Sequence, residues 1–253
     1  MAEAVASSEF AGVAGQGHVL TAARRAASHE PRRRASGPIT IVLADDHCLV
    51  RGGIRCLVEL ENDFRVVGEA ADGLKVARLV ERLKPRMLLV ALAMPGLNGL
   101  EITRQVHQQS PATAVIVISV CSKEEYVIQA LRNGASGYVV TCAKPAELVR
   151  AIRRVVAGHR YLSVPLSRRP MSTWLQHVKS AAIDAYETLT RREREVLLLV
   201  SEGYSSARIA SRLSIGRRTA ESHRASVMHK LKFSNQADLI RYVLARDVLL
   251  PVT

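Results

Sequence analysis

The chain has 253 residues, of which 48% are hydrophobic and 4% are aromatic, and its formal net charge at pH 7 is +13. The length suits two modest domains, and the charge predicts a polyanionic partner. Aromatic rings are too scarce to stack on the bases of a single strand, so we expect the protein to contact the phosphates of a nucleic-acid duplex. No apolar run is long enough to cross a bilayer and no signal-peptide core opens the chain, so we expect a cytoplasmic protein with no membrane partner.

Residues 1–37 are rich in Ala, Ser, Gly and Arg and carry consecutive arginines at 32–34. No helical or strand period persists through them, which predicts a disordered basic N-terminal extension. A weak helix over residues 19–27 is the alternative. The sequence leaves open whether this extension is a genuine part of the protein.

Residues 38–158 alternate short apolar runs with longer amphipathic stretches, a pattern typical of buried parallel strands joined by crossover helices. The predicted strands are 39–44, 66–70, 87–92, 115–120 and 138–140. The predicted helices are 49–61, 74–83, 100–108, 124–133 and 146–157. The expected fold class is therefore a doubly wound α/β domain with a five-stranded parallel sheet.

Prolines and arginines interrupt this alternation over residues 159–185, which we expect to be an interdomain linker with a short helix at 174–183. Residues 186–253 contain four short helical patterns and no strand pattern. They predict a small all-α domain that ends the chain.

Local signals predict how that all-α domain is built. Thr190 and Glu193 have the spacing of a capping box, and Gly203 ends the helix that they begin. A short helix opening at Ser205 or Ser206 is followed by a break at 214–216 and a helix from Thr219. Two short helices across a tight turn are typical of a helix-turn-helix, although a solvated surface helix explains scattered arginines about as well.

The segment LTRREREVLLLVSEGYSSARIASRLSIGRRTAESHRASVMHKL resembles the LuxR-type helix-turn-helix of bacterial transcription regulators. The resemblance implies a DNA-binding set on or beside the recognition helix: Arg217, Arg218, Thr219, Glu221, Ser222, His223, Arg224 and Lys230. Of these, Glu221 is expected to form a structural salt bridge rather than to contact a base. The resemblance also implies that residues 237–244 form a helix that often pairs two modules, which predicts a homodimer. Pairing of the receivers is the alternative interface, and the sequence does not choose between them.

The segments ITIVLADDHCLVRGGIRCLVE, VVGEAADG, MPGLNGLE, VIVIS and GASGYVV resemble the receiver domain of two-component response regulators. The complete chain thus resembles the NarL/FixJ-like arrangement of a receiver followed by a LuxR-type output domain. The resemblance implies the strand order 2-1-3-4-5. It also implies a pocket at the carboxyl edge of the sheet, formed by the positions Asp45, Asp46, Ala91, Ser119, Tyr138 and Thr141.

Two positions of that implied pocket lack the chemistry of phosphoryl transfer. Ala91 stands where the family has its nucleophilic Asp, and a methyl group neither accepts phosphate nor ligates Mg²⁺. Thr141 stands where the family has Lys, and it supplies no cation. We expect a degenerate pseudo-receiver with no catalytic residue, no cofactor, no resident metal and weak or absent Mg²⁺ binding.

Three cysteines and a histidine fall in loops at the same predicted edge: His47, Cys48, Cys121 and Cys142. Such a cluster has the donors to sense an oxidant or to bind a soft metal. The favoured alternative is that each cysteine is a small apolar filler. Cys56, beside Ile54 and Val58 in the first helix, is expected in the core.

The sequence therefore predicts a DNA-binding transcription regulator that is not an enzyme and acts without aspartyl phosphorylation. Its expected partners are double-stranded DNA, a second copy of the chain, and a protein or small-molecule regulator at the receiver. Two alternatives stay open. One is a conventional phosphorylation-controlled response regulator that uses a substitute acceptor. The other is a protein-interaction module that sequesters other regulators.

Overall fold

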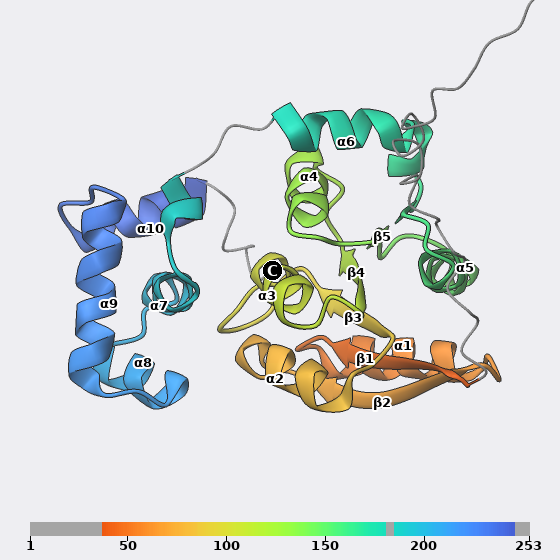
Figure 1. Ribbon diagram of the computed structural model, residues 1–253, viewed down its shortest axis with the longest axis horizontal. Coiled ribbons are helices and arrows are strands. Elements are labelled where there is room, and N and C mark those ends of the chain that lie inside the picture. Colours follow the sequence, from red (N-terminus) through yellow and green to blue (C-terminus); the bar gives the residue numbers. More distant parts are fainter. Residues whose placement is uncertain (1–36, 181–184, 246–253) are drawn as a thin grey trace, which may run out of the picture. The chain divides into compact units, whose positions relative to one another are not determined.

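The computed structural model describes residues 37–180 and 185–245 (Figure 1). The prediction of a disordered extension over residues 1–37 therefore falls, except for Gly37, outside the described residues. None of the helices within the described ranges is long and apolar enough to span a membrane.

The first half of the described chain is a parallel sheet flanked by helices (Figure 1). Its strands are β1 (Ile39–Ala44), β2 (Phe64–Ala70), β3 (Met87–Ala91), β4 (Ala114–Ser119), β5 (Gly137–Val140) and β6 (Tyr161–Leu162). Its helices are α1 (Cys48–Glu59), α2 (Gly73–Leu83), α3 (Gly99–Gln109), α4 (Glu124–Arg132) and α5 (Pro145–Val156). The strand order β2-β1-β3-β4-β5-β6 confirms the predicted 2-1-3-4-5 order.

Two apolar clusters cover the two faces of the sheet because alternate strand residues point to opposite sides. On one face, α1 and α5 bury Val58, Leu148 and Ile152. On the other face, α2, α3 and α4 contribute buried residues such as Val80 and Val127. This three-layer arrangement leaves the carboxyl ends of β1, β3, β4 and β5 at one edge of the sheet.

The predicted count of five strands was wrong, because β6 adds a sixth within the segment expected to be a linker. Tyr161 N donates to Ser136 O at 3.0 Å, and Ser163 Oγ accepts from Val140 N at 2.9 Å. A run of two residues carries no measurable periodicity. The strand forms because the edge of β5 offers unpaired backbone groups, which a sequence pattern does not reveal.

The next part of the expected linker, as far as α6, also packs onto the sheet domain. It forms the short 3-10 helix η1 (Leu166–Arg168) and the helix α6 (Met171–Ser180), which lies against α4 (Figure 1). Trp174 is only 3% exposed and its Nε1 donates to Leu166 O at 3.3 Å. Glu124 of α4 accepts from Arg169 Nη1 at 2.6 Å and lies 2.7 Å from His177 Nδ1.

The second module contains the 3-10 helix η2 (Ala185–Thr188) and the helices α7 (Arg191–Ser201), α8 (Ser206–Leu213), α9 (Arg217–Lys230) and α10 (Gln236–Ala245). The predicted capping box is confirmed, since Thr190 Oγ1 accepts from Glu193 N and Thr190 N donates to Glu193 Oε2 at 2.7 Å. Ser214 ends α8 at a positive φ of 54°. The recognition helix begins at Arg217, two residues before the predicted start at Thr219, because extended Gly216 is its N-cap.

Candidate DNA interface and receiver pocket

The outward side of α9 carries most of the predicted DNA-binding residues. Arg217, Arg218, Thr219, Glu221 and Ser222 are exposed. The side chains of Arg218, Thr219 and Ser222 form no hydrogen bond or ion pair within the part of the chain that the structure describes. The first two turns of α9 thus present one unpaired guanidinium and two hydroxyl groups to solvent, a set that suits phosphate and base edges.

The opposite side of α9 anchors it in the module. Ala220 and Val227 are buried, and Leu231 lies just beyond the helix. Arg224 Nη2 donates to Gln236 Oε1 of α10 at 2.8 Å, and both Arg224 and His223 are half-buried. This partial burial places the side chains of His223 and Arg224 at the border of the exposed face.

Lys230, expected among the DNA-binding residues, is exposed, but its ammonium group is engaged by another helix of the module. Its Nζ lies 2.7 Å from Glu193 Oε2, the carboxylate that also completes the capping box of α7. Burial alone raises the pKa of Glu193, but the hydrogen bonds from Lys230 and Thr190 outweigh it and lower that pKa below its ordinary value. This ion pair links the end of α9 to the start of α7.

Glu221 forms a salt bridge, but its partner is on the same helix. Arg217 Nε donates to Glu221 Oε1 at 2.9 Å, and the two side chains are 72% and 48% exposed. A pair four residues apart on a solvated helix stabilises it by about 0.3–0.5 kcal/mol. The contact supports α9 itself rather than joining it to another helix.

The implied receiver positions meet at one edge of the sheet. In the β1–β3 pair, Ala44 lies opposite Val90, so the next residues, Asp45 and Ala91, are neighbours. In the β4–β5 pair, Ser119 lies opposite Val140. Thr141 follows β5 directly and its N donates to Ser119 O at 2.9 Å. Asp45 and Ser119 are buried, whereas Asp46 and Thr141 are exposed.

The resemblance implies Mg²⁺ at this edge, and the available ligands test that implication. Among the described residues, one group has three candidate ligand atoms within 4.8 Å of one another: Asp45, Asp46 and His47. His47 Nδ1 lies 3.3 Å from Asp45 Oδ1 and 3.1 Å from Asp46 Oδ1. Mg²⁺ prefers oxygen ligands in an octahedron, and Ala91 offers no third carboxylate. The donor set does not fit the magnesium site of a phosphorylated receiver.

Tyr138, at the implied aromatic position, is fully buried. Its hydroxyl donates to Cys121 O at 2.7 Å. Burial raises the pKa of Tyr138 to about 12, although a hydrogen bond with Ser119 opposes the rise. The ring therefore packs as a neutral core side chain beneath the edge where Ala91 lies.

The cysteines do not assemble into a ligand set in the described ranges, where the candidate metal group contains none of them. Cys48 and Cys142 are exposed and Cys121 is half-buried, so the filler interpretation also fails for the first two. The expectation that Cys56 lies in the core was wrong, because it is exposed. Val58 faces the core, and a residue two positions away on a helix points to nearly the opposite side.

Several polar contacts join the sheet domain to the second module, and the sequence did not predict them. Asp72, the N-cap of α2, accepts from Arg212 Nη2 of α8 at 3.0 Å. Gly96 N donates to Glu202 Oε1 at 2.8 Å, and Gln105 of α3 donates to a carboxylate of α7 at 3.3 Å. Asp72 was recognisable as a cap ahead of a helical run, but its partner 140 residues away was not.

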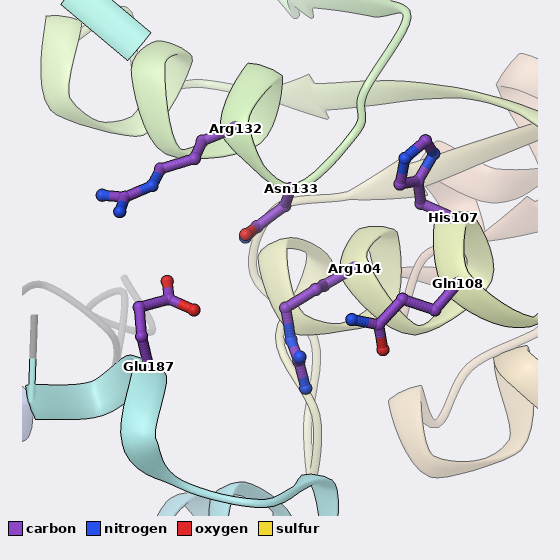
Figure 2. A pocket seen from close by; sticks show the side chains of 6 residues that line it. All are labelled: Arg104, His107, Gln108, Arg132, Asn133 and Glu187. Carbon is purple, nitrogen blue, oxygen red and sulfur yellow. The ribbon is translucent and has the colours of Figure 1, made fainter. Parts of the chain in front are cut away.

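A polar cavity of about 350 Å³ lies beside α3 and the end of α4 (Figure 2). Its lining consists of Arg104, His107, Gln108, Arg132, Asn133 and Glu187. Arg104 is already engaged there, with Nη2 2.7 Å from Glu101 Oε1. Burial raises the pKa of Glu101 despite this pairing. The lining mixes both signs of charge and defines no single ligand chemistry.

Comparison with known proteins agrees with this architecture. Residues 41–153 match the response regulator receiver domain, and residues 187–243 match the luxR family of bacterial regulatory proteins. The chain is 34% identical over 213 residues to the oxygen regulatory protein NreC of Staphylococcus aureus strain JH9, a match that spans 83% of this chain and 98% of NreC.

Solved structures with the same fold include a LuxR-family two-component response regulator from Aurantimonas sp. SI85-9A1. It is 34% identical with a TM-score of 0.52, over 55% of this chain and 99% of its own. RcsB from Salmonella enterica serovar Typhimurium, solved bound to promoter P1flhDC with the phosphomimetic BeF3-, is 26% identical with a TM-score of 0.50, over 82% of this chain and 98% of its own.

The chain belongs to the two-component response regulators that join a receiver domain to a LuxR-type DNA-binding domain, and it functions in transcription regulation.

Proposed function

We propose that this regulator binds duplex DNA without aspartyl phosphorylation, because its receiver is a pseudo-receiver. The observation that carries the proposal is the pair Ala91 and Thr141 at the carboxyl edge of the sheet. A methyl group has no oxygen to accept a phosphoryl group, and a threonine hydroxyl has no charge to neutralise one. The chain performs no catalysis of its own in this proposal.

The DNA-binding set is centred on the first turns of α9. Exposed Arg217 and Arg218 suit phosphate, while Thr219 and Ser222 have hydroxyl groups for base edges or backbone. His223 and Arg224 border this face, and Arg224 is the phosphate contact nearest α10. Glu221 and Lys230 support the helix through their ion pairs with Arg217 and Glu193.

The proposed layout has the extension 1–37, the receiver 38–158 and the DNA-binding domain 186–253, while the connecting segment 159–185 adds β6 and α6 to the receiver. The regulator acts in the cytoplasm as a homodimer on two half-sites, with α10 as a pairing helix. RcsB, a relative with the same fold, was solved on promoter DNA. With the phosphorylation switch absent, the carboxyl edge of the receiver is left to a protein or a small-molecule regulator.

The test combines a phosphorylation assay with DNA binding by the full chain. Wild-type protein is incubated with a small-molecule phosphodonor and Mg²⁺, and its intact mass and its affinity for a random-sequence duplex are measured. We expect no added phosphoryl group and an unchanged Kd, because position 91 has no nucleophile.

The matched control restores both missing groups as Ala91→Asp with Thr141→Lys, at a half-buried and an exposed position. This double variant is expected to gain one phosphoryl group under the same conditions. A phosphorylated wild-type chain would contradict the proposal and would favour a conventional regulator with a substitute acceptor such as Asp45 or Asp46.

A further inference from the structure

An exposed row of cations runs along α2. Lys75, Arg78 and Arg82 are all exposed on that helix, and Lys84 is exposed at its C-terminal end. The spacing of three and four residues keeps the first three within about 60° of the helix circumference, along a length of about 10 Å. We call these four residues the α2 stripe.

The charges of the α2 stripe are not neutralised within the described chain. None of its four side chains forms an ion pair or a hydrogen bond there, and nearby Glu81 is likewise unengaged. Elsewhere on the sheet domain several guanidinium groups are paired: Arg55 lies 2.7 Å from Glu69, and Arg153 lies 2.7 Å from Asp63. The α2 stripe thus presents a positive face that is available to an external anion.

The chemistry of the stripe favours a phosphate backbone over a protein surface. Stable protein interfaces have an apolar centre. The large exposed hydrophobic residues among those described are Leu49, Val50, Leu60, Val120 and Val164, and none lies on α2. Duplex DNA carries a charge about every 1.7 Å of its axis, so a row about 10 Å long faces several phosphates.

The stripe also begins next to the DNA-binding module. Asp72 immediately precedes α2 and lies 3.0 Å from Arg212 of α8. In a helix-turn-helix the first helix, here α8, crosses the DNA backbone while the second enters the groove. The backbone of a duplex read by α9 is therefore expected to pass α8, the helix whose Arg212 contacts Asp72 at the start of α2.

We propose that the α2 stripe is a second, sequence-independent DNA contact, which binds the phosphate backbone that flanks the site read by α9. This inference rests on the proposed function, because it assigns the stripe a share of the same duplex. The receiver would then contact DNA directly, and this contact would not depend on phosphorylation of the receiver.

The test measures how the affinity of the full chain for a random-sequence duplex, several helical turns long, changes with salt. Each phosphate contact contributes about 0.9 to the slope of log K against log salt. The variant Lys75→Ala, Arg78→Ala, Arg82→Ala is expected to reduce the magnitude of that slope by about 2 to 3. The variant Arg78→Lys, Arg82→Lys keeps the charge and is expected to keep the wild-type slope.

The matched control removes three exposed cations associated with α5, on the other face of the sheet: Lys144→Ala, Arg154→Ala, Arg160→Ala. It should keep the wild-type slope. Equal losses in the stripe and control variants would overturn the proposal in favour of a general charge effect. An unchanged slope in the stripe variant would also overturn it, because the stripe would then contact no phosphate. Absence of wild-type binding would instead contradict the proposed function itself.

Discussion

Tyr138 illustrates how single side chains stabilise the receiver edge. Its ring is fully buried and its hydroxyl donates to Cys121 O at 2.7 Å, so a polar group in the core has a partner. Burial raises the pKa of Tyr138 to about 12 from an ordinary value of 10.0. Because the folded-state pKa is the higher one, folding favours the neutral phenol, and the resulting stability is lost as the pH rises through this interval.

We expect Tyr138→Phe to lower the free energy of unfolding by about 1 kcal/mol near neutral pH, through loss of the hydrogen bond to Cys121. Urea unfolding followed by Trp174 fluorescence reports on this domain, since Trp174 is the single tryptophan and packs against it. Wild-type protein should lose stability between pH 10 and about 12, whereas the variant should lose less. An equal decline in both proteins would assign the effect to another group.

At the scale of elements, α9 is a helix with two differently occupied sides. Ala220 and Val227 face the module, and Lys230 joins its end to Glu193 at 2.7 Å. The outward side of its first turns has Arg218 with no side-chain partner among the described residues. A helix held on one side and open on the other meets the requirement for entry into a major groove.

Arg218→Ala and Arg224→Ala are each expected to weaken binding to all duplexes and to reduce the salt slope by about 1, because each removes one phosphate contact. Arg218→Lys should retain the slope. The control is Arg168→Ala in η1, an exposed arginine of the receiver half, which should leave both quantities unchanged. A wild-type slope in the Arg218→Ala and Arg224→Ala proteins would exclude these residues from the interface.

At the scale of the whole described chain, contacts to the receiver come from α7 and α8, and the outward residues of α9 remain exposed. Asp72 both caps α2, by accepting from Leu74 N at 3.0 Å, and pairs with Arg212. Arg212 in turn donates to Tyr204 Oη at 2.6 Å. One carboxylate thus supports a receiver helix and a contact with the DNA-binding module.

The variants Asp72→Asn and Arg212→Gln separate these two roles, since Asn remains a good helix cap but has no charge. Removal of an ion pair with about a quarter of each side chain exposed costs at most about 1 kcal/mol, so hydrogen exchange of the Gly96 amide should rise by up to about fivefold. The double variant should show no further increase. Unchanged exchange in the single variants would show that this pair does not hold the two modules together.

Much of the fold was predictable because local sequence patterns determine where its strands and helices lie. The apolar runs located the first five strands, and the capping box at Thr190 and Glu193 located the start of α7. The absence of a carboxylate at position 91 and of a cation at position 141 is likewise read directly from the chain. These features depend on residue type and spacing, which need no tertiary contact.

Only the tertiary structure decided the features that depend on partners distant in sequence. Strand β6 exists because β5 offers an unpaired edge, and Lys230 meets Glu193 because α9 crosses α7. Cys56 is exposed because the helical phase set by Val58 turns it outward. The fold also pairs other arginines, such as Arg55 and Arg153, with carboxylates, whereas the cations of the α2 stripe have no ion-pair partner among the described residues. Sequence determines which groups are available, and the fold determines which of them meet, because contact energies act only between groups brought within a few ångströms.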